Sequence, residues 1–284
     1  MVQAAIHAKH GHLMTKPRPA SCALLRQATA LGLPFGQEVS FKLLPGQLLD
    51  DRLLLGWSSQ VFAPLHFIDW LRSMGLPPPG AALLRAHAER ANAVLLSVEA
   101  RGTELLYKAY FEFWDDVRAT HRLGKPDAQA QPPLLHFGVK WLCGDPERIA
   151  QAEYRVHPLL SARDILQRLQ DLPQGNAEVL GTVRAIVQRG AMRRPGAAML
   201  YLEAREAGNA RHSCDINLYK TGLQLHDAAD LLRQLATSLA ISTPDFEPLL
   251  QAHQDLPLGH VAAGIDRHAQ EFLSVYLGVH ALPA

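Results

Sequence analysis

Residues 95–114, LLSVEARGTELLYKAYFEFW, have the pattern of a β-hairpin with one polar face. Residues 199–219 and 259–278 have the same form. Each segment enters through an apolar strand, turns at polar or glycine-containing residues, and leaves through a strand that carries a tyrosine. A supersecondary unit repeated at this scale indicates the architecture of the whole chain.

Pairs of helices are predicted before each hairpin. The apolar periodicity predicts them at residues 65–74 and 81–93, 161–172 and 177–189, and 227–239 and 243–253. Further strands are predicted at residues 39–43, 52–57, 134–142 and 154–156. Strands joined by tight turns are antiparallel, so the helices between hairpins must lie outside the sheet. We therefore expect an α+β fold in which about ten antiparallel strands, built from repeated ααββ units, close into a barrel and leave no exposed edge.

The composition narrows the class of protein. The 284 residues suit one large domain at residues 36–284, preceded by a flexible leader at residues 1–35. A net charge of +1 argues against a nucleic-acid-binding protein. No apolar run of about 18 residues occurs, so no membrane span is expected. Three widely spaced cysteines form no CxxC motif and suit a reducing cytoplasm, where we expect a monomer.

A barrel of this size has a lumen wider than its own side chains fill. Strand alternation places one face of each hairpin in that lumen. The basic and tyrosine side chains assigned to the inner wall are Lys42, Arg52, Lys108, Lys140, Arg205, Tyr110, Tyr201, Tyr219 and Tyr276. Lysine and arginine donate hydrogen bonds to phosphate, and aromatic faces attract cations. The alternative is that these residues face solvent on a one-sided sheet.

Several features resemble the ABBA-fold aromatic prenyltransferases: the repeated ααββ order, the K-x-Y step at residues 108–110, the Lys140 strand, and the strands of Tyr219 and Tyr276. The resemblance covers about residues 38–278 and implies a PT barrel. It also implies transfer of an allylic isoprenoid, dimethylallyl or geranyl, from its diphosphate (DMAPP or GPP) to a small aromatic molecule or a peptide side chain. Some members use Mg²⁺ and others do not, so metal dependence stays open.

The resemblance implies a role for each inner-wall residue. The diphosphate cradle would be formed by Arg52, Lys108, Lys140, Arg205 and Lys42. The cation-shielding and substrate-contacting residues would be Tyr110, Tyr219, Tyr276, Tyr201, His136 and Asn217. A carboxylate must accept the proton of the acceptor: Glu99 is the first choice, and Glu203 and Glu38 are the other candidates. No metal ligands are assigned. Residues 115–119 do not match a DDxxD motif, which argues against the all-helical prenyl synthases and not against the ABBA family.

Small residues on the predicted inner face suggest a roomy lumen. They are Gly138, Ala262 and Gly264. We expect space there for a large acceptor or for a prenyl chain longer than five carbons.

Two other functions are compatible with the sequence. One is a catalytically inactive barrel that binds a hydrophobic ligand or a peptide as an accessory biosynthetic protein; few cations in the lumen would favour it. The other is a metal or hydrolytic site drawn from His212, Glu203, Asp215, Asn217 and His260. The chain has no GxxxxGK[ST] or GxSxG motif and no convincing GxGxxG, which argues against nucleotide binding and serine hydrolysis.

Overall fold

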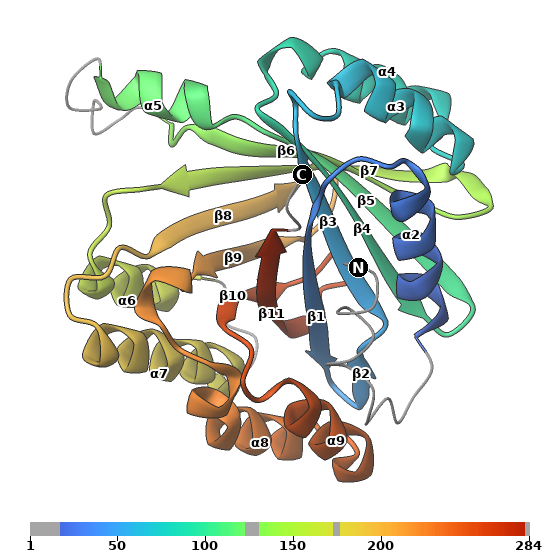
Figure 1. Cartoon of the computed structure of the whole chain (residues 1–284). Coiled ribbons are helices and arrows are strands. Elements are labelled where there is room, and N and C mark those ends of the chain that lie inside the picture. Colours follow the sequence, from blue (N-terminus) through green and yellow to red (C-terminus); the bar gives the residue numbers. More distant parts are fainter. Residues whose placement is uncertain (1–17, 123–130, 173–176, 282–284) are drawn as a thin grey trace, which may run out of the picture.

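A computed structural model describes residues 18–122, 131–172 and 177–281. Eleven strands of this part of the chain form one antiparallel sheet, in the order β11-β10-β9-β8-β7-β6-β5-β4-β3-β1-β2. They are β1 Gly36–Leu44, β2 Gln47–Leu49, β3 Arg52–Ser58, β4 Ala93–Arg101, β5 Glu104–Glu112, β6 Leu134–Leu142, β7 Asp145–His157, β8 Leu200–Glu206, β9 His212–Asn217, β10 Leu258–Ile265 and β11 Glu271–Ala281. Because β11 also pairs with β1, all strands except the short β2 close into the predicted barrel (Figure 1).

The helices surround this barrel on its outside (Figure 1). They are α2 Pro19–Ala30, α3 Pro64–Ser73, α4 Pro78–Arg85, α5 Trp114–Arg122, α6 Ala162–Asp171, α7 Ala177–Arg193, α8 Ala229–Ser238 and α9 Thr243–His253. The pairs α3–α4, α6–α7 and α8–α9 each precede a hairpin, as the sequence predicts. Among the described residues, no helix combines the length and apolar character needed to cross a bilayer.

Proline begins the second helix of the first pair. The helix predicted at residues 81–93 instead starts at Pro78 and ends at Arg85, and a 3₁₀ turn, Ala88–Arg90, follows it. Proline is favourable in a first helical turn because its missing N–H would have no intrahelical partner there.

Part of the predicted leader is folded onto the barrel. Leu24 and Ala28 of α2 are buried in the same apolar cluster as side chains of β3 and β4. The backbone N–H groups of Ala20 and Ser21 donate to the Asp51 carboxylate at 2.9 and 2.8 Å, which satisfies the start of the helix. Residues 19–30 of the expected leader therefore form a helix that packs on the barrel, and residues 1–17 lie outside the described residues.

The apolar core lies between the barrel and its helices. On β6, Phe137, Val139 and Trp141 point outward and are buried in this layer. Their neighbours His136 and Lys140 point inward and line the lumen. Burial of each large outer side chain stabilises the fold by about 1.5–3 kcal/mol. Since the outer layer supplies this apolar burial, the inner face of the barrel can carry polar side chains.

Candidate active site in the barrel lumen

The lumen holds two adjoining cavities. The larger, about 360 Å³, is the mouth chamber, whose polar lining includes Glu38, Glu112, Asp215, Tyr219 and His260. The smaller is the basic chamber, lined by residues that include Lys42, Arg52, Glu99, Lys108, Lys140 and Arg211. Eleven of the fourteen predicted site residues line one of the two: Glu38, Lys42, Arg52, Glu99, Lys108, Tyr110, His136, Lys140, Asn217, Tyr219 and Tyr276.

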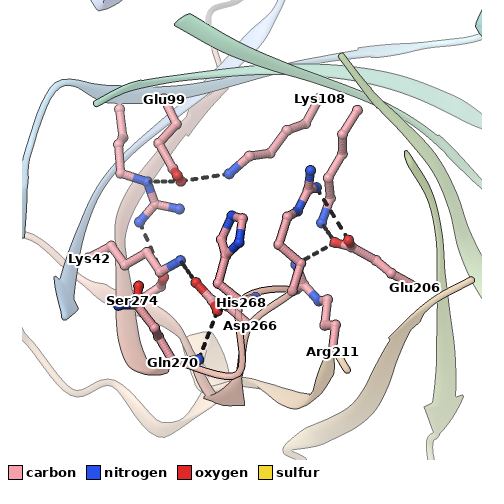
Figure 2. Close-up of polar contacts among 12 residues, drawn as sticks. Lys42, Glu99, Lys108, Glu206, Arg211, Asp266, His268, Gln270 and Ser274 are labelled. Carbon is pink, nitrogen blue, oxygen red and sulfur yellow. Dashed lines mark hydrogen bonds and ion pairs between the residues drawn. The ribbon is translucent and has the colours of Figure 1, made fainter. Parts of the chain in front are cut away.

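One half of the basic chamber is organised around Glu99 (Figure 2). Its Oε2 lies 2.6 Å from Lys108 Nζ and 3.1 Å from Arg52 Nε. The Arg52 guanidinium also donates to Ser274 Oγ at 3.2 Å and to the Tyr276 hydroxyl at 3.4 Å. Burial alone would raise the pKa of Glu99, but Lys108 and Arg52 hold it well below its usual value. Glu99 is therefore an ionised partner of these cations.

The other half is organised around Glu206 (Figure 2), which is not among the residues predicted from the sequence. Glu206 forms an ion pair with Lys140 and accepts hydrogen bonds from Arg211 at 3.0 Å and Asn209 at 3.0 Å. Arg267 lies 3.2 Å away on its other side. Although burial pulls the pKa of Glu206 upward, Lys140 and Arg211 lower it. The Lys140 side chain is only 2 % exposed, so this pair is a buried structural element.

Replacing Glu206 with glutamine is expected to lower the free energy of unfolding by about 3–5 kcal/mol, because Lys140, Arg211 and Arg267 would lose the buried carboxylate that they share. Urea denaturation followed by circular dichroism measures this change. The double variant Glu206→Gln/Lys140→Met should recover part of the loss. A single variant as stable as the parent protein would contradict the role of this pair.

Strand β8 presents the opposite face from the one predicted. Tyr201, Glu203 and Arg205 were assigned to the lumen, but the register of β8 places Leu202 there instead. Tyr201 is buried in the outer core, Glu203 accepts a hydrogen bond from Arg168 of α6 at 3.0 Å, and Arg205 is exposed. The prediction took the more polar face of each strand as the inner one. On β8 the inner face is largely apolar, so this criterion selected the outer side chains.

The alternative metal or hydrolytic site is assembled only in part: Asp215, Asn217 and His260 meet in the mouth chamber, whereas His212 and Glu203 do not join them. His212 and Asp215 are three residues apart on β9, so strand alternation puts them on opposite faces. Glu203 lies outside the barrel, as above. Within the ranges that the structure describes, no three His, Cys, Asp or Glu side chains form a group that could hold a metal ion.

A cluster of acidic and imidazole groups lies in the mouth chamber. Glu38 Oε1 accepts a hydrogen bond of 2.5 Å from the Tyr219 hydroxyl. His260 Nδ1 lies 2.8 Å from Asp215 Oδ1, and His260 Nε2 lies 4.0 Å from Glu38 Oε1. The Asn217 amide nitrogen is 3.2 Å from His260 Nε2. His260 therefore stands between two carboxylates.

Burial and charge act differently on these groups. Burial raises the pKa of Glu38, and His260 and Tyr219 offset that effect only in part. Burial opposes charge on His260, but Asp215 and Glu38 together raise its pKa to about 9. At neutral pH His260 is consequently an imidazolium, and burial gives Glu38 an increased affinity for a proton.

Tyr219 does not lie on a strand as predicted. Strand β9 ends at Asn217, and Tyr219 begins a 3₁₀ turn. Its ring packs directly on Gly259, where an added Cβ would lie 2.3 Å from the Tyr219 hydroxyl. Only glycine at position 259 therefore allows Tyr219 to reach Glu38.

The small residues of the inner face do not leave the expected space. A Cβ on Gly138 would lie 2.5 Å from the ring of Tyr110, so that ring already covers the position. Ala262 packs in a small apolar cluster with Phe272. Gly264, with φ of +137°, lies against the backbone of β9. The prediction of room for a large acceptor or a long prenyl chain is therefore wrong at Gly138 and Gly264, whereas Ala262 lines the basic chamber.

Three tyrosines separate the two chambers. Tyr110, Tyr154 and Tyr276 each line both cavities. The rings of Tyr110 and Tyr154 meet edge to face with centroids 5.7 Å apart, and Arg52 lies 5.5 Å from the centre of the Tyr276 ring. Burial raises the pKa of Tyr276 to about 12, so its hydroxyl stays protonated. Tyr154 was not assigned to the lumen because the sequence indicated only a three-residue strand at residues 154–156, which is too short to show which face is polar. The strand observed there, β7, has 13 residues.

The closed ten-strand barrel with outer helices is the PT barrel of the ABBA-type aromatic prenyltransferases. No protein-family model and no curated protein matches the sequence. Among solved structures, 6-dimethylallyltryptophan synthase from Micromonospora olivasterospora, in complex with DMASPP and Trp, superposes with a TM-score of 0.57 at 14% identity, covering 87% of this chain and 84% of that one.

Two further solved structures share this fold. 5-Dimethylallyltryptophan synthase from Streptomyces coelicolor has a TM-score of 0.56 at 15% identity, covering 87% of this chain and 82% of that one. PriB, in a binary complex with product diphosphate, has a TM-score of 0.55 at 16% identity, covering 85% of this chain and 79% of that one. At such identities the similarity establishes the fold.

Proposed function

We propose that this protein is a prenyltransferase that moves an allylic isoprenoid from its diphosphate onto an electron-rich acceptor in the lumen. The observation that carries this proposal is the order of the chambers: a basic chamber, a layer of tyrosines, and a mouth chamber that contains a buried carboxylate. The names of the structural neighbours agree, since one contains DMASPP with Trp and another product diphosphate.

The donor diphosphate would bind in the basic chamber, near Arg52, Lys42 and Lys108. Eight cationic side chains lie in and beside this chamber, and five carboxylates lie among them: Lys42, Arg52, Arg101, Lys108, Lys140, Arg148, Arg211 and Arg267, with Glu99, Glu104, Glu206, Asp215 and Asp266. The formal excess of three positive charges suits a multiply charged anion. Fixed cations around the leaving oxygen also stabilise the charge that develops as the C–O bond breaks.

In the proposed reaction, the electrons of the C–O bond leave with the diphosphate and an allylic cation remains. The rings of Tyr110, Tyr154 and Tyr276 would shield this cation from water and stabilise it by cation–π attraction. The acceptor's π electrons, or a heteroatom lone pair, then form the new bond to the allylic carbon. The proton displaced from the acceptor must pass to a base.

We assign the base to Glu38. Glu99, the first choice from the sequence, is already paired with Lys108 and Arg52, which weakens its affinity for a proton. Glu203 lies on the outer face of β8. Glu38 lines the mouth chamber, where an acceptor would bind, and burial strengthens its affinity for a proton.

Donor binding is expected to be accompanied by proton uptake. Burial lowers the pKa of Lys108 to about 7 and that of Lys42 to about 8. A bound diphosphate raises both pKa values by adding negative charge, so between pH 7 and 9 we expect uptake of up to about one proton and an affinity that falls as pH rises. Calorimetry of dimethylallyl thiolodiphosphate in Tris and in phosphate-free HEPES measures the uptake. The Lys108→Met variant should take up less, and equal heats in both buffers would contradict the prediction.

One observation favours the alternative of an inactive ligand-binding barrel. Glu99 and Glu206 occupy positions beside the cations that a diphosphate would otherwise contact. The number of lysines and arginines in the chamber points the other way, because a purely hydrophobic ligand would need none of them.

Calorimetric titration with dimethylallyl, geranyl and farnesyl thiolodiphosphates, with and without Mg²⁺, separates the two functions. Binding at about micromolar Kd, with a preference for one chain length, would support the donor site. Mass spectrometry of reactions with aromatic acceptors and aromatic peptides would then identify the product. If no donor analogue binds, the ligand-binding barrel becomes the better assignment.

A further inference from the structure

The barrel has a second opening at the end opposite the mouth chamber. Strand β5 runs from Glu104 at this far end, past Lys108 and Tyr110, to Glu112 at the mouth. The hairpin turns β4–β5, β6–β7, β8–β9 and β10–β11 all lie at the far end, while helices connect the strands at the mouth. A cavity of about 80 Å³ lies between these turns. We call it the far-end cavity.

The far-end cavity joins the basic chamber to solvent. Lys42, Lys108, Lys140 and Arg211 line both spaces. The outer rim includes Arg148, whose side chain is 53% exposed. Positive side chains therefore lead from the proposed diphosphate position to the surface, and they outnumber the carboxylates of Glu99, Glu104 and Asp266 that line the same cavity.

Two arginines of this cavity have hydrogen-bond donors to spare. The side chain of Arg101 makes no hydrogen bond or ion pair with any residue that the structure describes, and its Nε is buried. The Nε of Arg211 is likewise buried without a partner. Buried donors without acceptors are unfavourable, and a phosphate oxygen would satisfy them.

The mouth offers a much poorer route for a diphosphate. An anion leaving that way would have to pass Tyr110, Tyr154 and Tyr276 and then the apolar lining formed in part by Leu95 and Leu202. Moving a multiply charged anion along an apolar wall costs desolvation energy. Arg52, Lys108 and His260 also line the mouth chamber, but the carboxylates of Glu38, Glu112 and Asp215 line it too and would repel the anion. In the reaction proposed above, the prenylated product would also still occupy this chamber.

We propose that the far-end cavity is a phosphate-type anion site through which inorganic diphosphate leaves the barrel. This inference rests on the proposed function for its reaction, and the cavity itself would bind free diphosphate in any case. The leaving group would move from Lys108 to Arg101 and Arg148 without passing the organic product. No bond is made or broken along this path.

His268 stands in the opening. Figure 2 shows its side chain between the Glu99 group and the Glu206 group, and the residue lines the far-end cavity. It belongs to the β10–β11 turn, which the Asp266 carboxylate fixes by accepting from the N–H groups of His268 and Gln270 at 2.8 and 3.0 Å. A larger side chain on this turn would narrow the opening without entering the core.

The test compares an obstacle at each end of the barrel. His268→Trp narrows the far end, and Gly56→Phe fills part of the mouth chamber, where an added Cβ has only ordinary contacts with Leu95. Radiolabelled inorganic diphosphate is mixed with each protein, chased with unlabelled diphosphate, and filtered at timed intervals. We expect His268→Trp to slow association and dissociation alike by about tenfold, with Kd unchanged, because an obstacle raises the barrier in both directions. Gly56→Phe should leave both rates unchanged.

Other outcomes separate this inference from the proposed function. Three results would each overturn the far-end exit. Diphosphate could exchange more slowly in Gly56→Phe than in His268→Trp, its exchange rates could be unchanged in both variants, or inorganic diphosphate could fail to bind the parent protein. Failure of dimethylallyl thiolodiphosphate to bind, with the expected diphosphate kinetics intact, would refute the prenyl-donor function and leave the anion site standing.

Discussion

The Glu38→Gln variant is expected to lose about 10²- to 10⁴-fold in kcat, the range that removal of a general base produces. The amide keeps the size of the side chain and can still accept a hydrogen bond from Tyr219, but it cannot accept the proton of the acceptor. Donor binding should be retained, because Glu38 lines the mouth chamber and not the basic chamber. Steady-state kinetics with the acceptor found by mass spectrometry, together with calorimetry of a donor analogue, measure the two effects separately.

The matched control is Glu203→Gln. Glu203 was also a candidate base, yet it lies on the outer face of β8 beside Arg168. Its replacement should leave kcat unchanged within twofold or so, since surface substitutions of this kind change little. Equal losses in the two variants, or full activity in Glu38→Gln, would remove Glu38 from the role of base.

The Lys108→Met variant is expected to bind dimethylallyl thiolodiphosphate about 10- to 100-fold more weakly. A hydrogen bond to a charged group contributes about 1.5–3 kcal/mol, and each 1.4 kcal/mol corresponds to about tenfold in Kd. The effect should stay below that of a lost isolated charge because Arg52 and Lys42 remain in the chamber. Calorimetry at pH 7 measures the change, and circular dichroism checks that the variant is folded.

Arg205→Met controls for the loss of a positive charge as such. The sequence placed Arg205 in the same cradle, but its side chain is exposed outside the barrel. Its Kd for the donor analogue should equal that of the parent protein. If both variants bind like the parent protein, the diphosphate position near Lys108 is wrong.

Much of the barrel could be predicted from the sequence because its signals are local. Hairpin turns such as Gly208-Asn209 and the helical periodicity between hairpins are set by neighbouring residues. On β5 and β6 every outward position is apolar and inward positions such as Lys108 and Lys140 are polar, so alternation identified the correct face. In the observed register, Tyr110 of β5 pairs with Leu95 of β4 on one side and with Gly138 of β6 on the other.

The same reasoning failed on β8 because both of its faces contain apolar residues. Tyr201 is buried against helices, whereas Leu202 is buried in the lumen, and no local pattern separates the two environments. Because the predicted faces of β8 were exchanged, Glu206 was not considered as a lumen residue and Arg205 was wrongly placed in the lumen. A strand's register is set by its partners, here β7 and β9, and these are known only when the sheet is assembled.

The sequence by itself determined the repeated ααββ order, the closure into a barrel, and the presence of Lys108, Lys140 and Tyr276 on its inner wall. Only the tertiary structure decided how the charges are paired: Glu99 with Lys108, and Glu206 with Lys140. Secondary structure depends on residues close in the chain, and its periodicity can be seen in the printed sequence. Ion pairing and pKa values depend on distances of a few ångströms between strands far apart in that sequence, and folding alone sets those distances.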